Sequence, residues 1–157
     1  MIRTVSVASA GFVLIMLSAG AWAQEAINSP VGLWKNIDDE SGKSKALIRI
    51  TESNGVLTGT IEKLFREPNE DQSPKCIKCD GANKDQPIMG MVILTGLKKD
   101  PDAKDQVEYS GGTILDPNNG NVYKSKLKVD KDGKKLNVRG YIGFSWLGRS
   151  QVWLREQ

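Results

Sequence analysis

The stretch Pro30-Val31-Gly32-Leu33-Trp34-Lys35-Asn36 decides the fold that we predict for this chain. Gly32 lets the backbone bend or pass close to a neighbour, and Trp34 two residues later supplies a large apolar surface. Most of the chain that follows is typical of further strands, which we expect to pair in one sheet that begins with this stretch. A tryptophan early in the first strand can close one end of a small barrel, which is the role we expect for Trp34.

Residues 1–23 carry the three parts of a secretory signal peptide. Arg3 makes the start positive, Val5 to Leu17 is apolar, and Ala21-Trp22-Ala23 fits a cleavage site. The apolar run is shorter than the roughly 20 residues of a membrane-spanning helix, which argues against an uncleaved anchor. We therefore expect one domain over residues 24–157 with no membrane span after cleavage. The expected location is the periplasm, with an extracellular location as the alternative.

The composition limits the possible functions. The chain has 22 Lys and Arg against 19 Asp and Glu, interspersed along the sequence, and its net charge of +3 is too small to indicate a nucleic-acid partner. It contains no histidine, which removes the usual general base, the commonest zinc ligand and the histidine-activated nucleophile pairs. We expect no enzyme activity, no catalytic residues, no cofactor and no metal.

The remaining sequence alternates in the manner of strands joined by short turns. The clearest pattern sets Tyr123, Ser125, Leu127 and Val129 against intervening lysines, and Asn54-Gly55 is a strong hairpin signal. Besides the Trp34 strand, the predicted strands are 46–51, 56–65, 89–97, 107–115, 123–129, 136–142 and 149–156. Eight strands predict a single antiparallel up-and-down barrel, an all-β fold. An open β-sandwich is the structural alternative.

A long connection over residues 66–86 interrupts this pattern and contains both cysteines, Cys76 and Cys79. In an oxidising compartment, two cysteines at this spacing most often form a disulfide, which would hold the loop down. Two other interpretations stay open. One is a thiol-redox motif, and the other is a metal site completed by carboxylates such as Asp80 or Asp85.

The Gly-x-Trp of the first strand resembles that of the calycins, the superfamily of lipocalins, fatty-acid-binding proteins and avidins. That resemblance implies that an arginine near the end of the chain packs across Trp34. Arg155 is the first candidate and Arg149 the second.

A set of linked motifs from about residue 31 to 156 resembles one family of small exported bacterial proteins, domain of unknown function 2147. The motifs are Cys76-x-x-Cys79-x-Gly81, Gln86-Pro87-Ile88-x-Gly90, Gly111-Gly112-x-Ile114-x-Asp116-Pro117-x-x-Gly120-x-x-Tyr123, Arg139-Gly140-Tyr141-x-Gly143 and Gly148-Arg149-x-Gln151-x-Trp153. The resemblance implies a lipocalin-like barrel in the periplasm, and it carries over no catalytic residues.

Two functions fit such a barrel. It could bind a small, largely apolar molecule, with the polar end of the cavity toward the Cys76–Cys79 loop acting as a lid. The candidate lining residues are Tyr123, Leu127, Val138 and Ile142. Alternatively, a filled barrel would serve as an interaction or envelope-maintenance protein with a protein partner.

The size of the inward residues distinguishes the two functions. Bulky side chains that could fill the barrel are Trp34, Phe65, Met89, Met91 and Tyr123, whereas Gly59, Gly112, Ser125 and Gly140 could leave a void.

The connection over residues 143–148 is unusually apolar. Phe144, Trp146 and Leu147 could pack into one end of the barrel beside Trp34. They could instead form an exposed contact patch for a partner or a membrane surface, because apolar side chains in a turn are either buried or mark a contact.

Overall fold

The computed structural model describes residues 28–103 and 108–156. The predicted signal peptide, residues 1–23, and Val107 of one predicted strand lie outside them. The strands are β1 (Gly32–Ile37), β2 (Ser44–Ser53), β3 (Val56–Leu64), β4 (Val92–Lys99), β5 (Glu108–Leu115), β6 (Val122–Val129), β7 (Lys135–Tyr141) and β8 (Gly148–Glu156). A 3-10 turn, Gly81–Asn83, lies in the long loop. No helix in the described part of the chain is long and apolar enough to cross a membrane.

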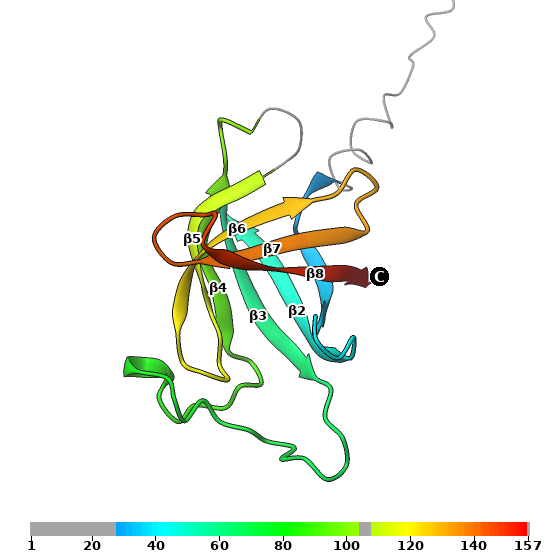
Figure 1. Ribbon diagram of the computed structural model, residues 1–157, viewed down its shortest axis with the longest axis vertical. Helices are drawn as coiled ribbons and strands as arrows, with labels where there is room; N and C mark the ends of the chain where they lie inside the picture. The colour runs from blue at the N-terminus through cyan, green and yellow to red at the C-terminus, as the bar shows by residue number, and fades with distance from the viewer. Residues whose placement is uncertain (1–27, 104–107, 157) are drawn as a thin grey trace, which may run out of the picture.

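The eight strands form one closed barrel, as Figure 1 shows. Each strand pairs antiparallel with the next, and β1 also pairs with β8, with Trp34 opposite Ile48 on one side and Arg155 on the other. Closure leaves no unpaired sheet edge. The predicted up-and-down barrel is therefore confirmed, and the open sandwich is wrong.

Glycines bend the sheet at the positions that the sequence indicates. Asn54 and Gly55 adopt positive φ angles of 52° and 75° in the β2–β3 hairpin, which suits residues that tolerate the left-handed region. The β5–β6 register shifts between Tyr109 and Gly112, and Gly111 between them has φ of 79°. Gly111 therefore lies in a bulge, and such bulges increase the coiling that a small barrel needs.

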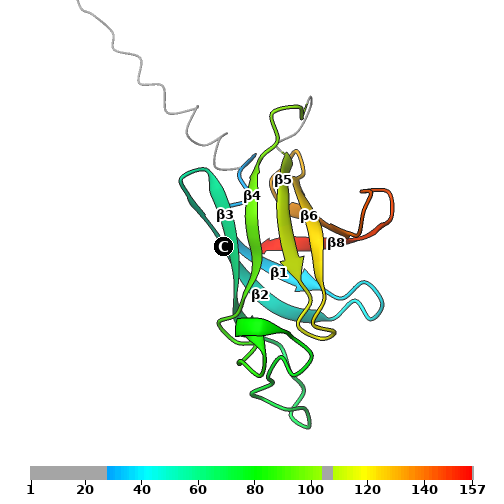
Figure 2. The same cartoon turned by 90° about the vertical axis from the view of Figure 1, so that its left-hand side faces the viewer.

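The two ends of the barrel differ. The β2–β3 and β6–β7 turns lie at one end, which we call the closed end. The β1–β2, β3–β4, β5–β6 and β7–β8 connections surround the other end, which we call the mouth (Figure 2). The β3–β4 connection is the longest of these and projects beyond the barrel as the green segment in both views.

The closed end is filled by side chains. Buried residues from six of the eight strands meet there: Trp34, Ile50, Leu57, Leu94, Leu97, Leu127, Val129, Leu136 and Val138. Two glycines make room for the large ones, because a Cβ at Gly59 would lie 2.8 Å from Leu94 and one at Gly112 would collide with the β4 backbone beside Leu97. These two glycines therefore do not leave a void.

Strand β4 begins later than the sequence predicts, at Val92 rather than Met89. The chain turns just before it, since Gly90 has φ of 82° and the Met91 N–H donates to the carbonyl of Ile88 at 3.1 Å. As a result Met89 is 47% exposed, and the expectation that it could fill the barrel is wrong.

Candidate functional site

Trp34 and Arg155 close the barrel together. Trp34 is completely buried, and its indole N–H donates to the carbonyl of Pro30 at 2.7 Å. The guanidinium carbon of Arg155 lies 4.2 Å from the Trp34 ring centroid, in cation–π geometry. The structure thus brings Trp34 together with Arg155, the first candidate for its partner.

Arg155 also ties two other chain segments to this closed end, the stretch before β1 and the β6–β7 turn. Its guanidinium donates to the carbonyls of Gly133 at 2.5 Å, Val31 at 3.0 Å and Ser29 at 2.7 Å. Burial lowers the pKa of Arg155 from its usual value. Gly32 is needed beside it, because a Cβ there would lie 2.9 Å from the Arg155 Nη1 atom and the φ of 140° disfavours other residues.

Above the packed end, the open part of the barrel and the loops around its mouth together line an open cavity of about 1400 Å³. Its floor is apolar and is built from four isoleucines on four different strands, Ile48, Ile61, Ile93 and Ile114, together with Trp153 of β8. The small inward residues Ala46 and Gly140 also line it. The barrel is therefore filled over one half and open over the other.

The predicted lining residues divide between the two halves. Tyr123 and Ile142 line the cavity. Leu127 and Val138 do not, since they are 0% and 2% exposed within the closed end, so that part of the prediction is wrong. Strand alternation correctly indicates that these four residues point toward the inside of the barrel or, for Ile142, directly follow a strand on that side. It does not indicate how far along the barrel axis each residue lies.

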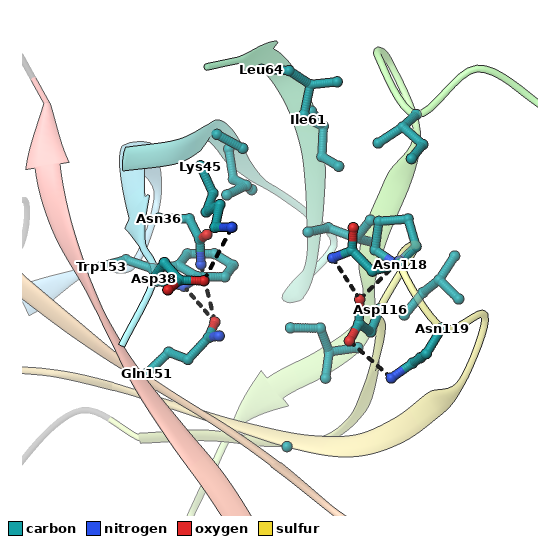
Figure 3. A pocket seen from close by; sticks show the side chains of 18 of the residues that line it. Asn36, Asp38, Lys45, Ile61, Leu64, Asp116, Asn118, Asn119, Gln151 and Trp153 are labelled. Atoms are coloured by element: carbon teal, nitrogen blue, oxygen red, sulfur yellow. Dashed lines mark hydrogen bonds and ion pairs between the residues drawn. The ribbon is translucent and has the colours of Figure 1, made fainter. Parts of the chain in front are cut away.

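A polar pair lies inside the cavity wall formed by β1 and β8. The amide of Asn36 donates to the Gln151 side-chain oxygen at 3.0 Å, and the indole N–H of Trp153 reaches the same oxygen at 3.4 Å (Figure 3). These residues are not among those predicted from the sequence. Even spacing could have found them, because Asn36 follows Trp34 by two positions and Gln151 precedes Trp153 by two.

The opposite wall is formed by the β5–β6 turn. Asp116 accepts hydrogen bonds from the amides of Asn118 at 3.1 Å and Asn119 at 3.0 Å. The Asn119 amide also reaches the Tyr123 hydroxyl at 3.2 Å. In Figure 3 this group faces Asn36 and Gln151 across the cavity. Polar groups thus lie on two sides of an apolar floor.

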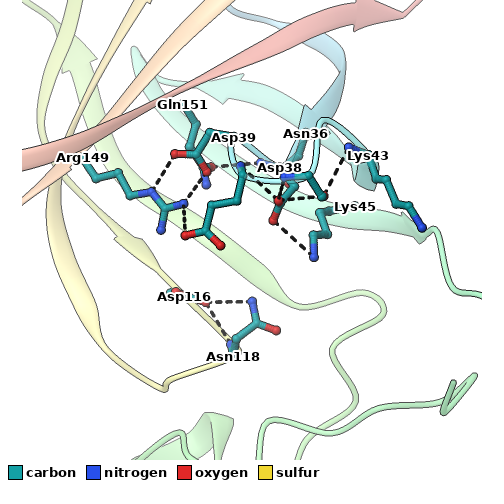
Figure 4. Close-up of polar contacts among 11 residues, drawn as sticks. Asn36, Asp38, Asp39, Lys43, Lys45, Asp116, Asn118, Arg149 and Gln151 are labelled. Atoms are coloured by element: carbon teal, nitrogen blue, oxygen red, sulfur yellow. Dashed lines mark hydrogen bonds and ion pairs between the residues drawn. The ribbon is translucent and has the colours of Figure 1, made fainter.

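Charged residues hold the β1–β2 loop at the rim (Figure 4). Arg149 forms a bidentate ion pair with Asp39, which lowers the pKa of that carboxyl and raises the pKa of the guanidinium. Asp38 accepts hydrogen bonds from the backbone N–H and hydroxyl of Ser41 and pairs with Lys45 at 3.2 Å, so its pKa is lowered. Arg149 therefore lies at the mouth and is not the partner of Trp34.

The loop over residues 66–86 forms part of the mouth and holds the disulfide. Cys76 and Cys79 are bonded, with Cα atoms 5.3 Å apart, and both are buried. The Cys76 Sγ lies 3.3 Å from the carbonyl oxygen of Pro117, and a Cβ at Gly120 would collide with the Lys78 carbonyl. The disulfide thus packs the loop against the β5–β6 turn, beside the cavity rather than across it.

The bond confirms the predicted Cys76–Cys79 disulfide, and its purely structural role stays a prediction. Neither cysteine lines the cavity, whereas Phe65, Arg66 and Ile88 near the ends of the loop do. That the polar end of the cavity lies toward this loop, and that the loop acts as a lid, stay predictions. Within residues 28–103 and 108–156, no three His, Cys, Asp or Glu side chains gather in a way that could hold a metal ion.

We expect titration of the denatured, unreduced protein to find no free thiol. Replacing both cysteines by serine should cost about 2 kcal/mol or less in unfolding free energy, because the bridge closes a very short loop. Hydrogen exchange should accelerate around residues 74–90 and stay unchanged in β1. Two reactive thiols, or bound zinc at one ion per chain, would contradict the structural role of the disulfide.

The apolar β7–β8 loop is exposed. Phe144, Trp146 and Leu147 retain 67%, 72% and 56% of their surface, and Ile142 before them retains 70%. This loop lies at the mouth, the opposite end of the barrel from Trp34, so the interpretation that it packs beside Trp34 is wrong. The contact-patch interpretation is the one that its exposure favours.

Comparison with known proteins supports the fold. The model of a family described as an uncharacterised protein conserved in bacteria, DUF2147, matches residues 32–155. The barrel is also similar to the structure of protein HP1028 from the human pathogen Helicobacter pylori, described as belonging to the lipocalin family. The TM-score is 0.67 at 17% sequence identity, over 82% of this chain and 84% of that one. No curated protein matches the sequence.

Proposed function

Because the chain belongs to the family of uncharacterised bacterial proteins DUF2147 and forms a lipocalin-like barrel, we propose that it binds one small, largely apolar molecule in the open half of the barrel. The cavity of about 1400 Å³ carries this proposal. Ligand sites are typically about 300–1,000 Å³, lined by apolar side chains with a few polar groups, so the volume accommodates a single molecule of ordinary metabolite or lipid size.

The lining supports an amphipathic ligand. An apolar chain would displace water from the isoleucine floor, which is the main source of affinity in such a site. A polar group would remain near Asn36 and Gln151, whose side chains already form a hydrogen bond inside the cavity. Lys63 and Arg66 line the cavity without an ion pair to another described residue, and so do Glu70 and Asp116, so the lining favours neither sign of charge on that polar group.

The proposed location is the periplasm, and the proposed activity is binding rather than catalysis. The signal-peptide pattern of residues 1–23 supports export, and the disulfide suits an oxidising compartment. The absence of histidine from the sequence supports a binding role, because the commonest acid–base and nucleophile pairs require that residue.

Native mass spectrometry of protein purified from the cells that make it tests the proposal. We expect a fraction of the protein to carry one added mass that solvent extraction releases on denaturation. The released compound should raise the melting temperature of the emptied protein, since a ligand that binds only the folded state stabilises it. A protein that arrives empty, and that no compound in a broad lipid and metabolite panel stabilises, would overturn the proposed function.

A further inference from the structure

We propose that the β7–β8 loop docks the protein onto an anionic phospholipid surface. Phe144 and Trp146 form the tip of this loop and do not line the cavity. Their rings stack with centroids 6.0 Å apart and planes inclined by 14°, leaving two aromatic side chains about two-thirds exposed to water. Figure 2 shows the loop standing out to the side of the barrel.

Hydrogen bonds keep this loop in its exposed position. Arg139 of β7 donates from Nε to the carbonyl of Ser145 at 2.5 Å and from Nη1 to the hydroxyl of Ser150 at 2.8 Å. The Leu147 N–H closes a turn on the Phe144 carbonyl at 3.0 Å. The aromatic tip is therefore preorganised for insertion and pays little additional ordering entropy on contact.

Positive charge on the outer face of strands β6 and β7, which lead toward the loop, identifies the partner. Strands β6 and β7 alternate, so that their outward side chains form one continuous face. Five of these side chains are cationic and none is acidic: Lys124, Lys126 and Arg139 in the half nearer the loop, and Lys128 and Lys135 toward the β6–β7 turn. Glu108 of the neighbouring strand β5 pairs with Lys126 at 2.8 Å, which leaves the face strongly positive. Such a face complements the negative surface potential of anionic lipids.

A lipid surface fits this combination better than a protein partner does. Tryptophan and phenylalanine beside lysine and arginine are typical of segments that lie in the headgroup region. Lysine is depleted at protein–protein interfaces, and two aromatic side chains of about 150–250 Å² each are small against the roughly 1,200–2,000 Å² of a stable complex. Leu147 and Ile142 of the same loop line the mouth, so docking would bring the cavity entrance next to the lipid.

Co-sedimentation with vesicles tests this docking. Wild-type protein should bind vesicles of phosphatidylglycerol and phosphatidylethanolamine and should bind phosphatidylcholine vesicles weakly. The double variant Phe144→Ala/Trp146→Ala should bind the anionic vesicles at least about tenfold more weakly. Lys124→Glu/Lys128→Glu should do the same, and raising the salt concentration should weaken wild-type binding. Ile77→Ala, which truncates an apolar side chain that is 64% exposed on the β3–β4 loop, is the matched control and should bind like wild type.

Trp146 fluorescence supplies a local readout. With Trp34 and Trp153 buried, a blue shift on vesicle addition that is absent from Trp146→Ala would place the loop in the headgroup region. The variant Ala46→Trp, which narrows the cavity, should keep full vesicle binding, so failure of ligand binding is distinguishable from failure of docking. Equal partition of wild type and Phe144→Ala/Trp146→Ala onto anionic vesicles would overturn the proposal. So would a soluble protein complex that needs these residues while vesicles cause no shift.

Discussion

Replacing Trp34 by alanine is expected to lower the unfolding free energy by about 3–5 kcal/mol, because the indole is fully buried at the centre of the closed end. The variant leaves a cavity, an unpaired Pro30 carbonyl and an Arg155 guanidinium without its aromatic partner. The cation–π contact contributes about 0.5–2 kcal/mol of this loss. Thermal denaturation should show a melting temperature lower by roughly 10–20 °C.

The control for Trp34→Ala is the same substitution at Trp146, which is 72% exposed. A substitution at such a surface position usually changes stability by less than about 0.5 kcal/mol. If both variants melted within a few degrees of wild type, Trp34 would not have the closing role that we assign to it.

The second large effect concerns ligand binding. The double variant Ala46→Trp/Gly140→Leu places two side chains into the cavity from β2 and β7, and it should weaken binding of an apolar ligand by about tenfold or more. A Cβ at Gly140 meets only ordinary contacts, 3.4 Å from Ile114 and 3.5 Å from Tyr123, so the barrel has room for it. Titration with the fluorescent apolar probe N-phenyl-1-naphthylamine measures the change.

A matched variant on the outer face distinguishes the effect of filling the cavity from a general disturbance of the two strands. Leu47→Trp/Asn137→Leu alters other positions of the same two strands, whose side chains point away from the cavity. It should bind the probe like wild type. Equal affinity of the filled variant and this control would mean that the probe binds elsewhere.

Much of the fold could be predicted from the sequence, because its determinants are local or periodic. Alternation such as that from Tyr123 to Val129 shows which side chains point inward, and Asn54-Gly55 determines the hairpin that sets the β2–β3 register. Eight such strands with short turns leave closure as the simplest solution. Arg155 was predictable through the calycin resemblance, and the structure shows why an arginine suits the position: it reaches three carbonyls at once.

The candidate site was predicted less well, since it depends on distances that alternation does not contain. Leu127 and Tyr123 share a face of β6, yet Leu127 lies in the packed half and Tyr123 lines the cavity. The height of each residue follows from register shifts and from which large side chains converge at one level. Asp39, which is distant in the sequence, holds Arg149 at the mouth. Arg139 holds the loop that exposes Trp146. Strand alternation predicts neither contact.

The measurement that tests the central claim most directly is the methyl NMR spectrum of isoleucine-labelled protein during titration with N-phenyl-1-naphthylamine. Ile48, Ile61, Ile93 and Ile114 form the cavity floor, whereas Ile50 lies fully buried in the closed end. A probe bound in the open half should shift the four cavity methyls together, saturating at one probe per chain, and leave Ile50 unchanged. Saturation with the cavity methyls unmoved, or shifts confined to the exposed Ile77, would contradict a ligand site inside the barrel.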